Sequence, residues 1–155
     1  MGFFDFGTPQ DMLDKAKREL KRLEDAAQPD EILSDDFKDH VYNFFVSAYH
    51  IVDYLDEPLK AQALAEDLIL RCGDAANKAK HMKLDPAKQR KKDKRLDAKT
   101  PKHYAFAPGA PVERRVEWCI TWPDGKSLEV VSFARDVIAK WEHFFASHGI
   151  GGPQC

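Results

Sequence analysis

The chain has 155 residues, of which 43% are hydrophobic, 11% aromatic and 32% charged. This length and composition predict one globular, soluble domain with a real core and without room for a second full domain. No apolar run approaches the roughly 20 residues that a membrane-spanning helix needs, and the first residues lack the basic and long apolar regions of a secretory signal.

The formal net charge of −2 hides an uneven distribution. Residues 78–102, called the basic segment below, hold eleven of the 24 Lys and Arg residues but three of the 26 Asp and Glu residues, a net charge of +8. The remaining residues hold 13 basic and 23 acidic groups, a net charge of −10. Such a segment can attract a polyanion over a long range, and it can equally dock on the acidic surface of its own chain.

Three amphipathic helices are predicted in the first half of the chain. Thr8 as N-cap and Pro9 at the first helical position start a helix over residues 9–27. Further helices are predicted over residues 34–55 and, opened by Pro58, over 58–82. The apolar face of each helix repeats at helical spacing. It contains Leu13, Ala16, Leu20, Leu23 and Ala27 in the first helix and Phe37, Val41, Phe44, Phe45, Ala48, Ile51, Val52 and Leu55 in the second. In the third helix it contains Ala61, Leu64, Leu68, Cys72, Ala75 and Ala79. The short connections predict an antiparallel bundle.

The second half changes character. Residues 84–103 lack apolar periodicity and predict a basic, mobile loop. Alternation over residues 116–122, a tight turn at residues 123–126 and a return strand over 128–131 predict a β-hairpin, to which residues 103–107 can add a third strand. Ser132 is expected to cap a last helix over residues 132–148, which Gly149 ends.

The predicted fold class is therefore α+β, mainly α. A single domain over residues 1–155 would contain an antiparallel three- to four-helix bundle (9–83), the basic loop (84–103), a small antiparallel hairpin unit (104–131), the closing helix (132–148) and a tail (149–155). The three cysteines form no C-x-x-C pair, which favours a reducing, cytoplasmic location.

Two polar seams border the apolar faces of the second and third helices. They contain His40, Asn43, Ser47, His50 and Tyr54 on one helix, and Asp67, Arg71, Asp74, Lys78 and His81 on the other. The catalytic interpretation takes His50 or His81 as a general acid or base, with Asp74 as its orienting carboxylate and Asn77 beside it, although Asp74 and His81 lie about two turns, roughly 10 Å, apart along the helix. His50, Asp53 and Tyr54 are the candidate lining of a pocket.

The plainer interpretation of both seams is a solvated helix face. Ion pairs four residues apart, such as Asp67–Arg71 and Asp74–Lys78, would then stabilise the helix by a few tenths of a kcal/mol each. No H-x-x-x-H, H-E-x-x-H or G-x-S-x-G spacing occurs, and His50 with Asp53 is the single tidy pair of potential metal ligands. We therefore expect no metal and no other cofactor.

The basic segment predicts contact with RNA or another polyanion. Its most concentrated part contains Lys88, Arg90, Lys91, Lys92, Lys94 and Arg95. Counterion release would make such binding steeply dependent on salt concentration. Aromatic residues, which would favour base stacking, are absent from the basic segment, and the first ones after it are Tyr104 and Phe106.

Three stretches resemble a group of small bacterial proteins with A-Y-H-x-x-D-(W/Y) and D-x-A-N-x-x-K-H segments and a C-terminal W-x-x-F helix. Here they read FFVSAYHIVDYL, CGDAANKAKHMKLD and ARDVIAKWEHFF, within roughly residues 40 to 146. The resemblance implies a cytosolic bacterial or phage protein and carries no activity over. More distantly, the paired helices are similar to HEPN-type bundles, many of which are RNases, and this implies a role linked to RNA, defence or toxin–antitoxin systems. That family separates its Arg and His by four to six residues, whereas nine separate Arg71 from His81.

Three hypotheses follow. The first is a HEPN-like interaction module that binds RNA or another polyanion through the basic segment. The second is an RNase or phosphotransfer enzyme using His81, Asp74, Asn77 and Lys80. The third is a structural homodimer subunit without catalytic activity, packed through the Leu13 and Leu20 stripe.

Overall fold

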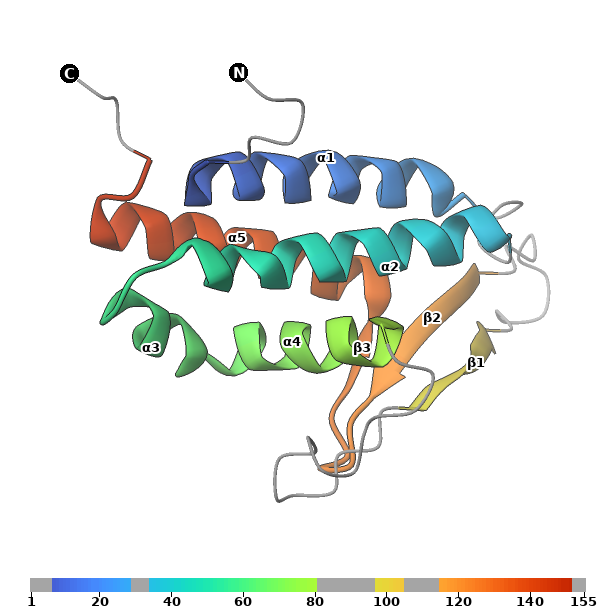
Figure 1. Ribbon diagram of the computed structural model, residues 1–155. Helices are drawn as coiled ribbons and strands as arrows, with labels where there is room; N and C mark the ends of the chain where they lie inside the picture. The colour runs from blue at the N-terminus through green and yellow to red at the C-terminus, as the bar shows by residue number, and fades with distance from the viewer. Residues whose placement is uncertain (1–6, 29–33, 81–96, 105–114, 152–155) are drawn as a thin grey trace.

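The computed structural model describes residues 7–28, 34–80, 97–104 and 115–151, with the backbone alone for 79–80, 97–104 and 115–117. Four longer helices lie side by side, with a small sheet at one end (Figure 1). The elements are α1 (Pro9–Ala26), α2 (Asp35–His50), the 3₁₀ helix η1 (Ile51–Tyr54), α3 (Leu59–Leu64), α4 (Asp67–Lys80), β1 (Asp97–Tyr104), β2 (Arg115–Thr121), β3 (Ser127–Glu129) and α5 (Val130–His148). The predicted class, α+β and mainly α, is confirmed.

The helix ends follow their capping residues. The Thr8 side chain accepts a hydrogen bond from the Asp11 backbone N–H while the Asp11 carboxylate accepts one from the Thr8 backbone N–H, so α1 starts with the reciprocal capping arrangement. Ser34 is the N-cap of α2, and its Oγ accepts a hydrogen bond from the Phe37 backbone N–H. Gly149 ends α5 with φ of 66°, a left-handed conformation that glycine adopts without steric cost. All three ends agree with the sequence prediction.

The predicted third helix, 58–82, is wrong as a single element, because it divides into α3 and α4 around residues 65–66. The Glu66 N–H bonds to the Ala63 carbonyl, and the Leu70 N–H then bonds to the Glu66 carbonyl, so a new helix starts there. Ala63 and Ile69 are both fully buried, although six residues at about 100° each would set them roughly 120° apart around one continuous helix. The break lets both reach the core and leaves Leu64 and Leu68 only partly buried.

The sheet has the strand order β1-β2-β3, and all pairs are antiparallel. β1 starts at Asp97, so the prediction of a loop was wrong for residues 97–103, and the predicted strand over 103–107 starts earlier than expected. Residues 105–107 lie outside the described part. The register shifts between Lys99 and Lys102, the interval that contains Pro101. A proline has no N–H to donate to the ladder, so within a sheet it is tolerated in an edge strand or at an irregularity such as this one.

The hairpin turn agrees with its sequence signal. The Trp122 N–H donates to the Lys126 carbonyl, and the Gly125 N–H donates to the Trp122 carbonyl, with Gly125 at φ of 87°. The predicted return strand over residues 128–131 is too long, because α5 already starts at Val130. Glu129, not Ser132, is the N-cap: its carboxylate accepts from the N–H groups of Val131 and Ser132. Val130 and Val131 thereby reach the core from the first turn of a helix.

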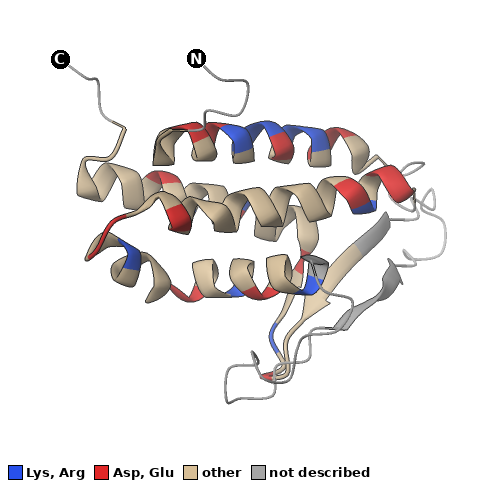
Figure 2. Cartoon of the chain, in the orientation of Figure 1, with Lys and Arg blue, Asp and Glu red and all other residues tan. Residues whose placement is uncertain are grey.

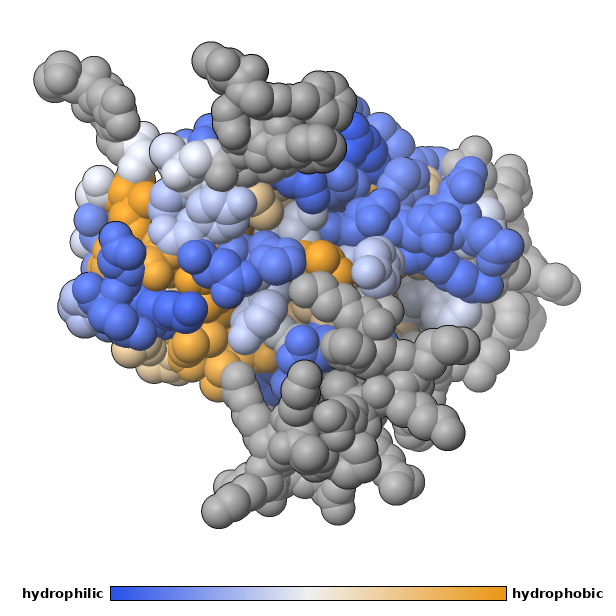
Figure 3. Space-filling model, viewed as in Figure 1, coloured by the Kyte–Doolittle hydropathy of each residue, from blue (hydrophilic) through white to orange (hydrophobic). Residues whose placement is uncertain are grey.

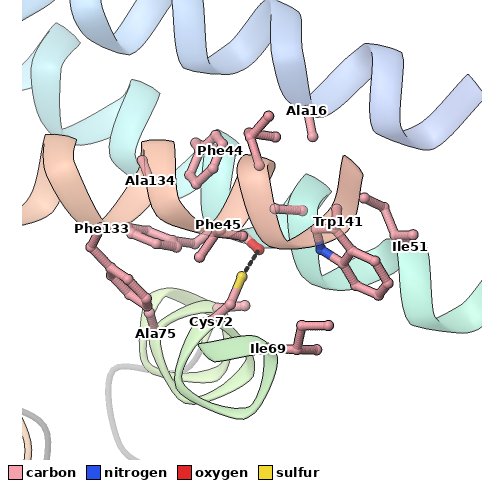
Figure 4. Packing of buried hydrophobic residues seen from close by; sticks show 14 of the residues in the cluster. Ala16, Phe44, Phe45, Ile51, Ile69, Cys72, Ala75, Phe133, Ala134 and Trp141 are labelled. Carbon is pink, nitrogen blue, oxygen red and sulfur yellow. Dashed lines mark hydrogen bonds between the residues drawn. The ribbon is translucent and has the colours of Figure 1, made fainter. Parts of the chain in front are cut away.

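One apolar core joins α1, α2, α4, β2 and α5. Aromatic rings fill its centre, with Phe45 5.1 Å from Phe44 and 5.2 Å from Phe133 between centroids (Figure 4). Leu13 of the α1 stripe is buried within this core and Leu20 packs against it, so the surface proposed for a homodimer is occupied by the chain itself. On the face seen in Figure 3, hydrophobic residues gather towards the end where α3 lies, and α1 is largely hydrophilic.

Candidate functional site

The polar seam of α4 meets the hairpin at Arg71. The Arg71 Nε donates to Asp67 Oδ2 at 2.8 Å, one turn earlier on the same helix, as the spacing predicted. Its Nη2 donates to Asp124 Oδ2 at 2.7 Å, across to the turn between β2 and β3. The guanidinium carbon also lies 5.1 Å from the centroid of the Trp122 ring. We call this group of contacts between Arg71, Asp67, Asp124 and Trp122 the Arg71 latch.

Asp124 has two roles in the Arg71 latch. Its Oδ1 accepts from the Lys126 backbone N–H at 3.0 Å and so stabilises the hairpin turn, while its Oδ2 binds Arg71. Lys126 extends the group, since its Nζ lies 3.5 Å from Asp67 Oδ2. The sequence signal Pro-Asp-Gly-Lys predicts a turn alone. The partnership of Asp124 and Lys126 with α4 was therefore missed.

Charge pairing shifts the pKa values of both kinds of group in the Arg71 latch. Hydrogen bonding from Arg71 lowers the pKa of Asp67 below its ordinary value of 3.8, and the nearby positive charges of Arg71 and Lys126 act in the same direction. Hydrogen bonding to Asp124, with a smaller effect from Asp67, raises the pKa of Arg71. Asp67 and Arg71 therefore both carry their charges over the physiological pH range.

The predicted catalytic residues lie further along α4. Asp74 is partly buried and Asn77 is exposed, one turn apart on the same helix. His81 lies outside the described residues, so the predicted set of His81, Asp74 and Asn77 stays a prediction. Lys80 is the last residue of α4.

The predicted pocket residues lie near the opposite end of α4. His50 ends α2 and its Nδ1 lies 2.6 Å from Asp53 Oδ2, with the two side chains 42% and 56% exposed. Tyr54 packs against the edge of the core. The antiparallel course of α2 and α4 places His50 towards the early part of α4, which is the orientation expected for neighbouring antiparallel helices (Figure 1). The structure does not bring His50 and Asn77 together.

Helix α1 partly encloses the polar seam of α2. The Lys15 Nζ donates to the Oγ of Ser47, which is buried. Glu19 is also buried and pairs with Arg22 at 2.7 Å. Sequence reasoning missed both Lys15 and Glu19. Their position four residues apart beside the apolar stripe of α1 was the signal that could have indicated them.

The residues predicted to bind nucleic acid, Lys88, Arg90, Lys91, Lys92, Lys94 and Arg95, lie outside the described residues. The two ends of the basic segment are placed: exposed Lys78 on α4, and Lys99 and Lys102 in β1. Lys99 pairs in register with Cys119 and Lys102 with Glu117. Cys119 and Glu117 are two apart on β2, so the register shift puts Lys99 and Lys102 at positions on the same face of the sheet.

Within residues 7–28, 34–80, 97–104 and 115–151, no three His, Cys, Asp or Glu residues form a group that could hold a metal ion. No helix in the same part of the chain has both the length and the apolar composition needed to span a membrane. Comparisons of the chain with protein-family models, with curated proteins and with solved structures found no match.

Proposed function

We propose that this chain is a cytoplasmic interaction module that binds RNA, or a polyanion of similar charge density, through the basic segment. The observation that carries the proposal is the net charge of +8 over residues 78–102 in a chain whose other residues total −10. A dense run of Lys and Arg residues is a common binding element for RNA.

The placement of the two ends of the basic segment supports the proposal. Lys78 is exposed near the end of α4, and the irregularity of β1 puts Lys99 and Lys102 at same-face positions of the sheet. The segment is thus tied at both ends to folded elements. A binding segment with fixed ends loses less conformational entropy on binding than a free tail does.

The surface charges of the described body also support binding by the basic segment in preference to α1. Lys17 pairs with Glu142, Lys21 with Asp25 and Arg22 with Glu19, so basic residues of α1 have acidic partners close by. Figure 2 shows the basic and acidic residues of α1 interspersed and acidic residues at the start of α2. These regions do not form a surface of one positive sign.

The test is RNA binding over a salt series with charge-neutralised variants. Deleting residues 86–100 would remove part of β1, so six substitutions to Gln at Lys88, Arg90, Lys91, Lys92, Lys94 and Arg95 are the better design. We expect RNA affinity to fall steeply with salt in the original chain. The slope of log affinity against log salt should become shallower by about 0.7 for each lost phosphate contact to a single strand.

A control neutralises basic residues outside the basic segment: the exposed Arg18, Lys21 and Lys38 and the half-buried Lys60. This control should retain RNA affinity. Equal losses in both variants, or no binding by the original chain at low salt, would contradict the proposal. RNA cleavage is scored in the same samples, and cleavage that stops in His81→Ala with the fold intact would favour the RNase hypothesis.

A further inference from the structure

We draw no further inference here: the strongest candidate, the apolar surface patch over α3 and the first turn of α4 that contains Leu64, Ala65 and Leu68 (Figure 3), carries nothing, because nothing in the described part of the structure shows what covers it.

Discussion

Helix α4 is held in place by different physical means on its two sides. Towards α2 and α5 it presents small or apolar buried residues, among them Ile69, Cys72 and Gly73, to an aromatic core (Figure 4). Towards the hairpin it presents Arg71, whose partners are largely exposed carboxylates. The apolar side gains free energy in proportion to buried area and packing, whereas ion pairs with largely exposed carboxylates contribute little. The stability of this helix should therefore depend mainly on its apolar side.

The largest effect is expected from truncation on the apolar side. Phe45 contacts the rings of Phe44 and Phe133, and its carbonyl faces the Cys72 thiol, so Phe45→Ala leaves a cavity beside α4. We expect a loss of about 3–5 kcal/mol in the free energy of unfolding, measured by urea denaturation. Phe45→Leu, which retains most of the volume, should lose clearly less. A loss below about 1 kcal/mol for Phe45→Ala would contradict the view that packing dominates this side.

A smaller loss is expected at Gly73, where α4 lies close to Tyr49 of α2. A Cβ atom added at Gly73 would lie 2.5 Å from Cε2 of the Tyr49 ring, so the ring must move to accept it. Gly73→Ala should destabilise by about 1–3 kcal/mol through overpacking, less the roughly 0.5–1 kcal/mol that alanine gains over glycine in a helix. Thermal denaturation measures the difference. The same substitution in a Tyr49→Leu background should cost less, and equal costs in both backgrounds would show that Tyr49 is not the obstacle.

On the charged side, removal of Arg71 is expected to affect stability little. The carboxylates of Asp67 and Asp124 are exposed enough to be solvated again, and the Met side chain of Arg71→Met can still pack on Trp122. We expect a loss of about 1 kcal/mol or less in the free energy of unfolding. A loss as large as that of Phe45→Ala would remove the distinction between the two sides of α4.

The smallest effect is a dependence of the Arg71 latch on pH. Arg71 lowers the pKa of Asp67 in the folded chain, so the stabilisation is fully present above the ordinary carboxyl pKa of 3.8 and is lost as the pH falls through the lowered value. An NMR titration of the Asp67 carboxyl carbon measures this pKa directly. In Arg71→Met the pKa should return towards 3.8. An unchanged, still lowered pKa would assign the shift to Lys126 instead of Arg71.

The extent to which the site followed from sequence differs between its members. The Asp67–Arg71 pair follows from a spacing of four residues on one helix, and the structure confirms it. Asp124 lies 53 residues from Arg71, and no local pattern relates them. Lys15 and Ser47 are likewise 32 residues apart and meet only because α1 and α2 pack together. The catalytic set, the pocket and the nucleic-acid-binding residues stay predictions.

The sequence by itself determined the elements whose causes are local: the start of α1 at Thr8, the start of α2 at Ser34, the hairpin turn at Gly125 and the end of α5 at Gly149. Capping, turn chemistry and apolar periodicity act over a few residues, so they can be recognised in a linear chain. Only the tertiary structure decided the division of α3 from α4, the start of β1 at Asp97 and the Arg71 latch. Each of these depends on a partner distant in sequence, whose contribution to the free energy exists only once the chain has folded.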